Sequence, residues 1–77
     1  SKKEIPDEIP EITPSIYDVT TVLTESKICK SKSEARQNID QGGVKINEIK
    51  VEAKNYTAPV AKNDVVQKGS RFFVKVK

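Results

Sequence analysis

The sequence predicts a small α+β domain in which two short helices precede several β-strands. Apolar residues recur at helical spacing in residues 15–26, and a capping box opens a second helical segment at residue 31. From residue 44 onward, short runs alternate apolar and polar residues, as half-buried strands do. Helices and strands that are segregated along the chain are typical of the α+β class. A chain of 77 residues forms at most one such domain, with one thin core.

Residues 1–14 predict a Pro/Ile-rich linker from an upstream domain, so the folded domain is expected over residues 15–77. Three prolines fall four residues apart in this leader and are interspersed with isoleucines and acidic residues. Proline at this density blocks a helix and favours an extended chain. The isoleucines could pin part of the leader onto a neighbouring element, and the chain is expected to continue a larger protein.

The first helix is expected over residues 15–26. Ser15 follows Pro14 and is a suitable N-cap, while Asp18 lies in the first turn, where the helix dipole favours a negative charge. Three threonines lower the helix propensity, so packing must hold this helix. The predicted inward-facing residues are Ile16, Val19, Val22 and Leu23.

A capping box begins the second helix. The hydroxyl of Ser31 is expected to accept from the amide near Glu34, and the Glu34 carboxylate is expected to accept from the amide of Ser31. Ala35 and Ile39 are one turn apart and are expected to face the core. Gly42 ends the helix, because the left-handed conformation costs glycine little.

Strand segments follow the second glycine. Residues 44–47 and 49–51 are expected to form a hairpin, whereas residues 65–67 and 71–77 form two further strands joined by a turn. Residues 52–63 are polar and irregular.

The last strand predicts two different faces. Phe72 shares one face with two valines, whereas Phe73 shares the other with Arg71 and two lysines. Phe73 could stack on a nucleic-acid base. Alternatively, leader residues such as Ile9 and Ile12 cover the ring, which is the interpretation that we favour.

The composition excludes several functional classes. The chain has no histidine, so the commonest general base and the commonest metal ligand are both missing. Its single cysteine, Cys29, rules out an internal disulfide and fits a reducing, cytosolic setting; a small apolar role is favoured over a reactive thiol. No apolar run approaches the roughly 18 residues of a membrane span, and the start lacks the apolar region of a signal peptide.

The charge is distributed unevenly along the chain. The net charge is +3, but residues 1–26 carry −4, from two lysines and six acidic residues. Residues 27–77 carry +7, from twelve basic and five acidic residues. A basic body behind an acidic leader is expected of a polyanion binder. The alternative is a lysine-rich solvated surface, which is common in small domains.

The second helix carries the strongest candidate binding surface. Its start offers free backbone amides, which bind phosphate readily, and its face opposite Ala35 and Ile39 is cationic and polar. Lys45 and Asn47 of the next strand point away from the core, so the helix and strand faces would form one L-shaped polar surface. The candidate RNA-binding residues are Lys30, Ser31, Lys32, Ser33, Arg36, Gln37, Gln41, Lys45 and Asn47.

Each of these features also has an ordinary structural explanation. Ser31 and Glu34 first of all build a helix cap. Arg36 and Asp40 could form a surface pair worth about 0.2–0.5 kcal/mol, and Lys45 could be a solvated strand lysine. The double glycine is a helix stop, because it lacks the spacing of a nucleotide-binding loop.

The segments KSKSEAR and QGGVKIN together resemble a family of small RNA-binding domains named after the fourth protein of the small ribosomal subunit. That family starts a helix with S-[RK]-S-E-A-[RK], ends it with glycine and continues with V-x-[IV]-N. The double glycine, the Pro/Ile leader and the KGSRFFVKV ending resemble one subgroup over residues 5–77, the C-terminal domains of bacterial-type tyrosyl-tRNA synthetases. The matching residues are Ser31, Lys32, Ser33, Glu34, Ala35, Arg36, Gly42, Val44, Ile46 and Asn47.

The resemblance implies an S-four-like (alpha-L) RNA-binding fold, with two helices packed on a small, mostly antiparallel sheet. It implies a domain that grips tyrosine tRNA, around the long variable arm and the anticodon stem, while a catalytic domain absent from this chain performs ATP-dependent tyrosylation. The chain alone is expected to catalyse nothing and to hold no cofactor or metal. ATP and Mg would belong to the parent enzyme, a tyrosine-tRNA ligase that is expected to be a cytoplasmic homodimer.

One position departs from the family pattern. Family hairpins usually carry glycine after the asparagine, whereas this chain has Glu48 after Asn47. Both central positions of an Asn-Gly turn take positive φ. Glu48 is therefore expected to be strained by about 1 kcal/mol, or the turn changes its type.

Two alternatives to a synthetase domain remain at this stage. The first keeps the fold and changes the target, to ribosomal RNA or to the substrate of an RNA-modifying enzyme such as a pseudouridine synthase. The second is a protein-interaction module that pairs through the edge of the long strand at residues 72–76.

Overall fold

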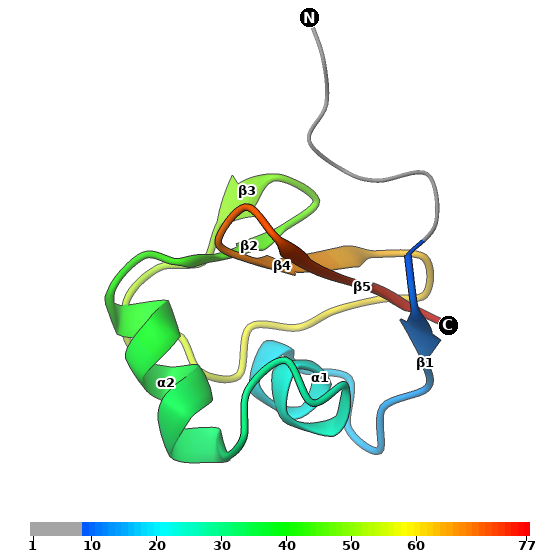
Figure 1. The fold of residues 1–77 in the computed structure, drawn as a ribbon, viewed down its shortest axis with the longest axis horizontal. Helices are drawn as coiled ribbons and strands as arrows, with labels where there is room; N and C mark the ends of the chain where they lie inside the picture. The colour runs from blue at the N-terminus through cyan, green and yellow to red at the C-terminus, as the bar shows by residue number, and fades with distance from the viewer. Residues whose placement is uncertain (1–8) are drawn as a thin grey trace, which may run out of the picture.

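The computed structural model describes residues 9–77, in which two helices pack against one face of a five-stranded sheet (Figure 1). The strand order is β1-β5-β4-β2-β3; β1 runs parallel to β5 and the other pairs are antiparallel. The predicted α+β class and mostly antiparallel sheet are confirmed. The elements are β1 (Glu11–Ile12), α1 (Val19–Glu25), α2 (Lys32–Asp40), β2 (Val44–Ile46), β3 (Ile49–Lys50), β4 (Val65–Lys68) and β5 (Phe72–Val76).

The leader contributes a strand to the sheet. Glu11 and Ile12 pair with the second half of β5, in register with Lys75 and Val76. The backbone of β5 donates to the carbonyls of Pro10 and Ile12, at 2.8 Å each. Residues 1–8 of the predicted linker lie outside the described residues, and the boundary between linker and domain stays a prediction.

Helix α1 begins three residues later than predicted. Asp18 is its N-cap, because the carboxylate accepts from the Thr21 amide at 2.7 Å. The assignment of Ser15 as the cap was wrong: its amide donates to the Glu25 carboxylate at 2.9 Å, and its hydroxyl donates to the same group. Ile16 is 58% exposed and does not face the core. The prediction that Val19, Val22 and Leu23 face inward is confirmed, since all three are fully buried.

Helix α2 follows the sequence pattern closely. Its N-cap Ser31 accepts from the Glu34 amide at 3.2 Å, and Ala35 and Ile39 are fully buried. The reciprocal bond differs by one residue, because Glu34 Oε1 accepts from the amide of Lys30 at 2.9 Å rather than from that of Ser31. The chain leaves the helix through Gly42 in the left-handed region, at φ +77°.

The hairpin keeps the turn type that its sequence disfavours. Ile46 and Ile49 pair across a two-residue turn in which Asn47 has φ +52° and Glu48 has φ +70°. Positive φ at both central positions is the signature of a type I′ turn. Of the two expected outcomes, backbone strain at Glu48 is the one that the structure contains.

The core lies between the helices and the inner face of the sheet. Val44, Val66, Val74 and Val76 are buried on that face and form one cluster with the apolar residues of both helices. Cys29 belongs to this cluster and is 1% exposed, which agrees with its predicted apolar role. Burial raises the pKa of its thiol, because the thiolate would lose hydration.

The two phenylalanines of β5 differ from expectation. Phe72, expected beside the valines, is 49% exposed because it stands at the open end of the strand, whereas Phe73 is 7% exposed. That burial excludes base stacking by Phe73, which shares a hollow with Pro10 and Ile12. Strand β5 is also no free edge, since it lies between β1 and β4, so the predicted edge-pairing through this strand is wrong as stated.

Candidate nucleic-acid interface

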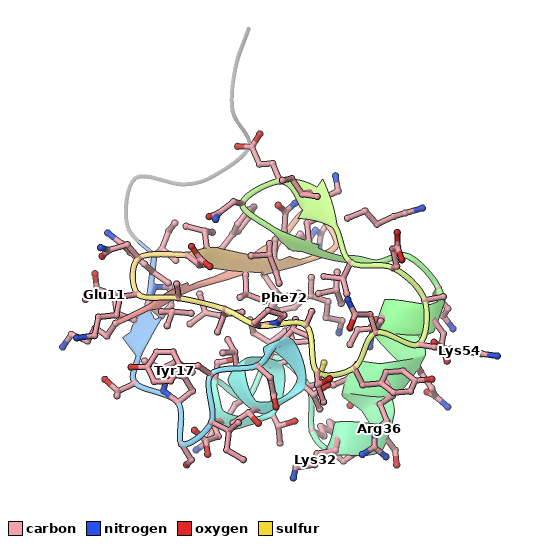
Figure 2. All side chains as sticks on the ribbon, turned by 180° about the vertical axis from the view of Figure 1, so that it is seen from behind. Glu11, Tyr17, Lys32, Arg36, Lys54 and Phe72 are labelled. Carbon is pink, nitrogen blue, oxygen red and sulfur yellow. The ribbon has the colours of Figure 1, made fainter. Side chains whose placement is uncertain are left out.

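The exposed face of α2 carries a stripe of charged side chains. Lys32, Arg36 and Asp40 follow one another at intervals of four residues, which places them above each other on one side of a helix. All three are exposed. Figure 2 shows Lys32 and Arg36 pointing outward from α2. Two cations on adjacent turns can each approach a phosphate oxygen without desolvating the core.

The structure places every predicted RNA-binding residue at the surface, and RNA binding by them stays a prediction. Ser31 is engaged in the helix cap, and the same cap occupies the amides of Lys30 and Glu34. A phosphate site at the helix start therefore depends on the amides between these two. The exposed candidates are Lys30, Ser31, Lys32, Ser33, Arg36, Gln37, Gln41, Lys45 and Asn47.

Asn47 has a structural task that the sequence did not reveal. Its side-chain amide donates to Asp64 Oδ1 at 3.0 Å, and its carbonyl oxygen accepts from the Val65 amide at 3.0 Å. These bonds fasten the hairpin turn to the start of β4. The polar atoms of Asn47 are thus already satisfied within the fold.

Lys50 joins the two arms of the predicted L-shaped surface. It pairs with Lys45 across the β2–β3 hairpin, and both side chains lie on the sheet face away from the core. The Lys50 side chain also lies over the end of α2, with its Cδ 3.4 Å from the point where a Cβ on Gly42 would stand. A cation there is favoured by the negative end of the helix dipole. Sequence reasoning missed Lys50, although its alternation with Ile49 and Val51 was a usable signal.

Asp40 does not form the surface pair with Arg36 that its spacing suggested. Its carboxylate accepts from the Tyr56 hydroxyl at 2.9 and 3.1 Å and from the Lys54 amide at 2.9 Å. The guanidinium carbon of Arg36 lies 5.7 Å from the centre of the Tyr56 ring, a cation–π contact. The hydrogen bond to Asp40 raises the pKa of Tyr56, because a carboxylate acceptor stabilises the neutral phenol.

This arrangement brings Lys54 to the cationic side of α2. Figure 2 shows Lys54, Arg36 and Lys32 at the same end of the molecule, with side chains directed outward. Residues 52–63 showed no periodicity, so nothing local in the sequence pointed to Lys54.

A further cationic group lies at the start of α2. Lys68 forms an ion pair with Glu34 at 3.8 Å, the one salt bridge found among residues 9–77, and its ammonium lies 5.1 Å from the centre of the Phe72 ring. A partly exposed pair of this kind contributes about 0–1 kcal/mol to stability. Lys68 therefore neutralises the only acidic residue in the first turn of α2.

The described residues carry no sign of a metal site. Within residues 9–77, no three His, Cys, Asp or Glu side chains gather closely enough to hold an ion. None of the helices in that part of the chain is long and apolar enough to cross a membrane.

Comparison with known families identifies the type of domain. Residues 2–74 match the family model described as "Tyrosine--tRNA ligase SYY-like C-terminal domain". The match covers nearly all of the chain, including α2, the hairpin and most of β5.

Curated relatives agree with the family model. The chain is 43% identical over 77 residues to the tyrosine–tRNA ligase of Haemophilus influenzae, covering 99% of this chain and 19% of the relative. It is 39% identical over 75 residues to that of Bordetella pertussis, covering 95% and 18%. It is 40% identical over 72 residues to that of Cytophaga hutchinsonii, covering 88% and 17%. The chain thus spans less than a fifth of the length of these relatives.

Proposed function

Because the chain belongs to the family of tyrosine–tRNA ligase SYY-like C-terminal domains, we propose that it binds tyrosine tRNA on behalf of a tyrosine–tRNA ligase. The observation that carries the proposal is the cationic side of α2. Lys32 and Arg36 stand there on successive turns, above a core that needs neither side chain. This surface favours phosphates, and it suits recognition of RNA by shape.

The parent protein that we propose is an ATP- and Mg-dependent enzyme in the cytoplasm, acting as a homodimer. The relatives are named as ligases, and the chain corresponds to less than a fifth of their length. The chemistry would then reside in the remaining four fifths, and this chain by itself would contribute tRNA affinity and no catalysis. Tethering makes such a contribution effective even when the isolated domain binds weakly.

A double charge reversal tests this proposal. We expect Lys32→Glu with Arg36→Glu to weaken binding of a bacterial tyrosine tRNA transcript by about tenfold or more at low salt, because two phosphate contacts become repulsive. Fluorescence anisotropy over a salt series measures the affinity and its salt dependence. Circular dichroism and the thermal midpoint should stay unchanged, because both side chains are exposed.

The matched control reverses two cations at the other end of the molecule. Lys62 and Lys77 flank the contact between Asn63 and Val76, and the C-terminus lies across the molecule from α2 (Figure 1). Lys62→Glu with Lys77→Glu changes the net charge equally and should weaken binding far less. Equal losses in both double variants would reduce the effect to net charge, and an unchanged affinity in the first would place the tRNA surface elsewhere.

A further inference from the structure

We propose that residues 52–58 form part of the tRNA-binding surface, with Lys54 as a phosphate contact that Asp40 and Tyr56 hold in place beside α2. This inference rests on the proposed function and extends it to a segment far along the chain from α2. Lys54 would be a binding residue, whereas Asp40 and Tyr56 would be positioning residues.

The argument begins with the third place in the α2 stripe. Lys32 and Arg36 are followed four residues later by Asp40, whose negative charge should repel a phosphate that follows the stripe. Successive members of the stripe are about 6 Å apart along the axis, at about 1.5 Å per residue. An isolated acid at that place would weaken binding, so its local partners decide what it does.

Those partners all come from the segment at residues 52–58. The Asp40 carboxylate accepts from the Lys54 amide at 2.9 Å and from the Tyr56 hydroxyl at 2.9 and 3.1 Å. Both of its oxygens are engaged, so its charge is directed into the protein. The Lys54 backbone is thereby held against the end of α2, at the place where the stripe would otherwise present an acid.

Tyr56 fastens the same segment to both helices. Its ring lies under the Arg36 guanidinium at 5.7 Å, and its carbonyl accepts from the hydroxyl of Thr20 in α1. The ring is partly buried and packs against the core cluster. Arg36 and the segment therefore hold one another in a fixed relative position, which lowers the entropy lost when both bind a phosphate backbone.

The backbone at Lys54 supports the same interpretation. Asn55 donates to the Glu52 carbonyl at 3.1 Å, which closes a turn with Lys54 at its third position. Lys54 has φ +68° there, a conformation that costs a non-glycine residue about 1–2 kcal/mol. The hydrogen bond from its amide to Asp40 helps to hold this conformation. A long cationic side chain thus stands at a position that glycine would occupy without strain.

Two substitutions at one residue separate position from charge. Asp40→Asn and Asp40→Ala remove the same negative charge, but only asparagine retains an oxygen that accepts from Lys54 and Tyr56. If charge alone matters, both variants bind a bacterial tyrosine tRNA transcript more tightly and to the same extent. Our proposal predicts instead that Asp40→Ala binds about threefold or more weakly than Asp40→Asn, with a shallower salt slope.

Lys54 itself is tested by its salt signature. We expect Lys54→Ala to weaken binding about three- to tenfold and to reduce the slope of log affinity against log salt by about one. The matched control is Lys62→Ala, an exposed loop lysine away from α2, which should leave both quantities nearly unchanged. Tyr56→Phe keeps the ring under Arg36 and removes one bond to Asp40, so its loss should be intermediate.

The outcomes distinguish this inference from the proposed function. Suppose that reversal of Lys32 and Arg36 weakens binding, while Lys54→Ala equals its control and the two Asp40 variants agree; the segment is then no part of the surface, and the proposed function stands. If reversal on α2 has no effect, the proposed function itself fails. A change in thermal midpoint shared by all variants would identify a folding effect, which the salt slope does not report.

Discussion

Individual side chains of this domain hold backbone conformations that their own residue types disfavour. Within residues 9–77, the non-glycine residues with positive φ are Lys27, Asn47, Glu48, Lys54 and Asn63. Asparagine tolerates this region because its side chain is short and polar, whereas lysine and glutamate do not. Each of the latter stands in a turn whose ends are held by other contacts, as Ile46 and Ile49 hold the turn at Glu48. Strain at these positions follows from their surroundings.

We predict that Glu48→Gly stabilises the domain by up to about 1 kcal/mol, because glycine relieves the left-handed strain at the second position of the type I′ turn. The greater freedom of glycine in the unfolded chain offsets part of this gain. The free energy of unfolding in urea measures the effect. Glu48→Ala provides the control: it also removes the charge but keeps a Cβ, so an equal gain there would contradict strain as the cause.

At the scale of elements, the two helices depend on different kinds of support. Helix α2 has a complete local cap, in which Ser31 and Glu34 satisfy amides on either side of the helix start. Helix α1 is seven residues long and rich in threonine, and it begins at Asp18. It is held mainly by burial of Val22 and its apolar neighbours in the core. A helix with local signals is predictable from sequence to within a residue, whereas one held by packing is not.

Removal of the α2 cap should be measurable apart from RNA binding. We expect Ser31→Ala to lower the free energy of unfolding by about 1 kcal/mol, because the Glu34 amide loses its acceptor. Ser33→Ala is the matched control, since this serine lies one turn inside the helix start and is exposed. Thermal unfolding followed by circular dichroism compares the two variants. A loss equal to that of Ser33→Ala would show that the cap contributes nothing.

At the scale of the whole molecule, one core supports separate faces. The inner sheet face and both helices bury a single apolar cluster, which leaves the outward side of α2 and the outer face of the hairpin for cations. Residues 27–77 hold a net charge of +7, and the helix, hairpin and residues 52–58 each present part of it at the surface. Because the core needs none of these side chains, the surface charge can be changed without loss of the fold.

The buried thiol provides a probe of this single core. Cys29 is 1% exposed, and burial raises its pKa, so it should react with a disulfide reagent only when the core opens. We expect labelling at mildly alkaline pH to be far slower than in the urea-unfolded chain. The labelling rate should rise in proportion to the destabilisation caused by Ser31→Ala. Rapid labelling of the native protein, at a rate insensitive to stability, would contradict a single cooperative core.

The sequence by itself determined the fold class, helix α2 with its cap and glycine stop, the hairpin at residues 44–50 and the cations Lys32 and Arg36. These features follow from periodicity, capping and turn chemistry, each of which acts within about ten residues. The same local rules placed the cap of α1 at Ser15, because a serine after a proline satisfies them as well as Asp18 does.

Only the tertiary structure decided what Asp40, Lys50, Lys54 and Phe73 do. The bonds of Asp40 reach 14 and 16 residues along the chain, and the pairing of β1 with β5 joins the two ends of the domain. Such contacts form because the core brings distant backbone segments together, and an irregular segment such as residues 52–63 carries no local signal of its destination. The shape of the cationic surface is therefore a property of the packed molecule, although most of its charges are visible in the sequence.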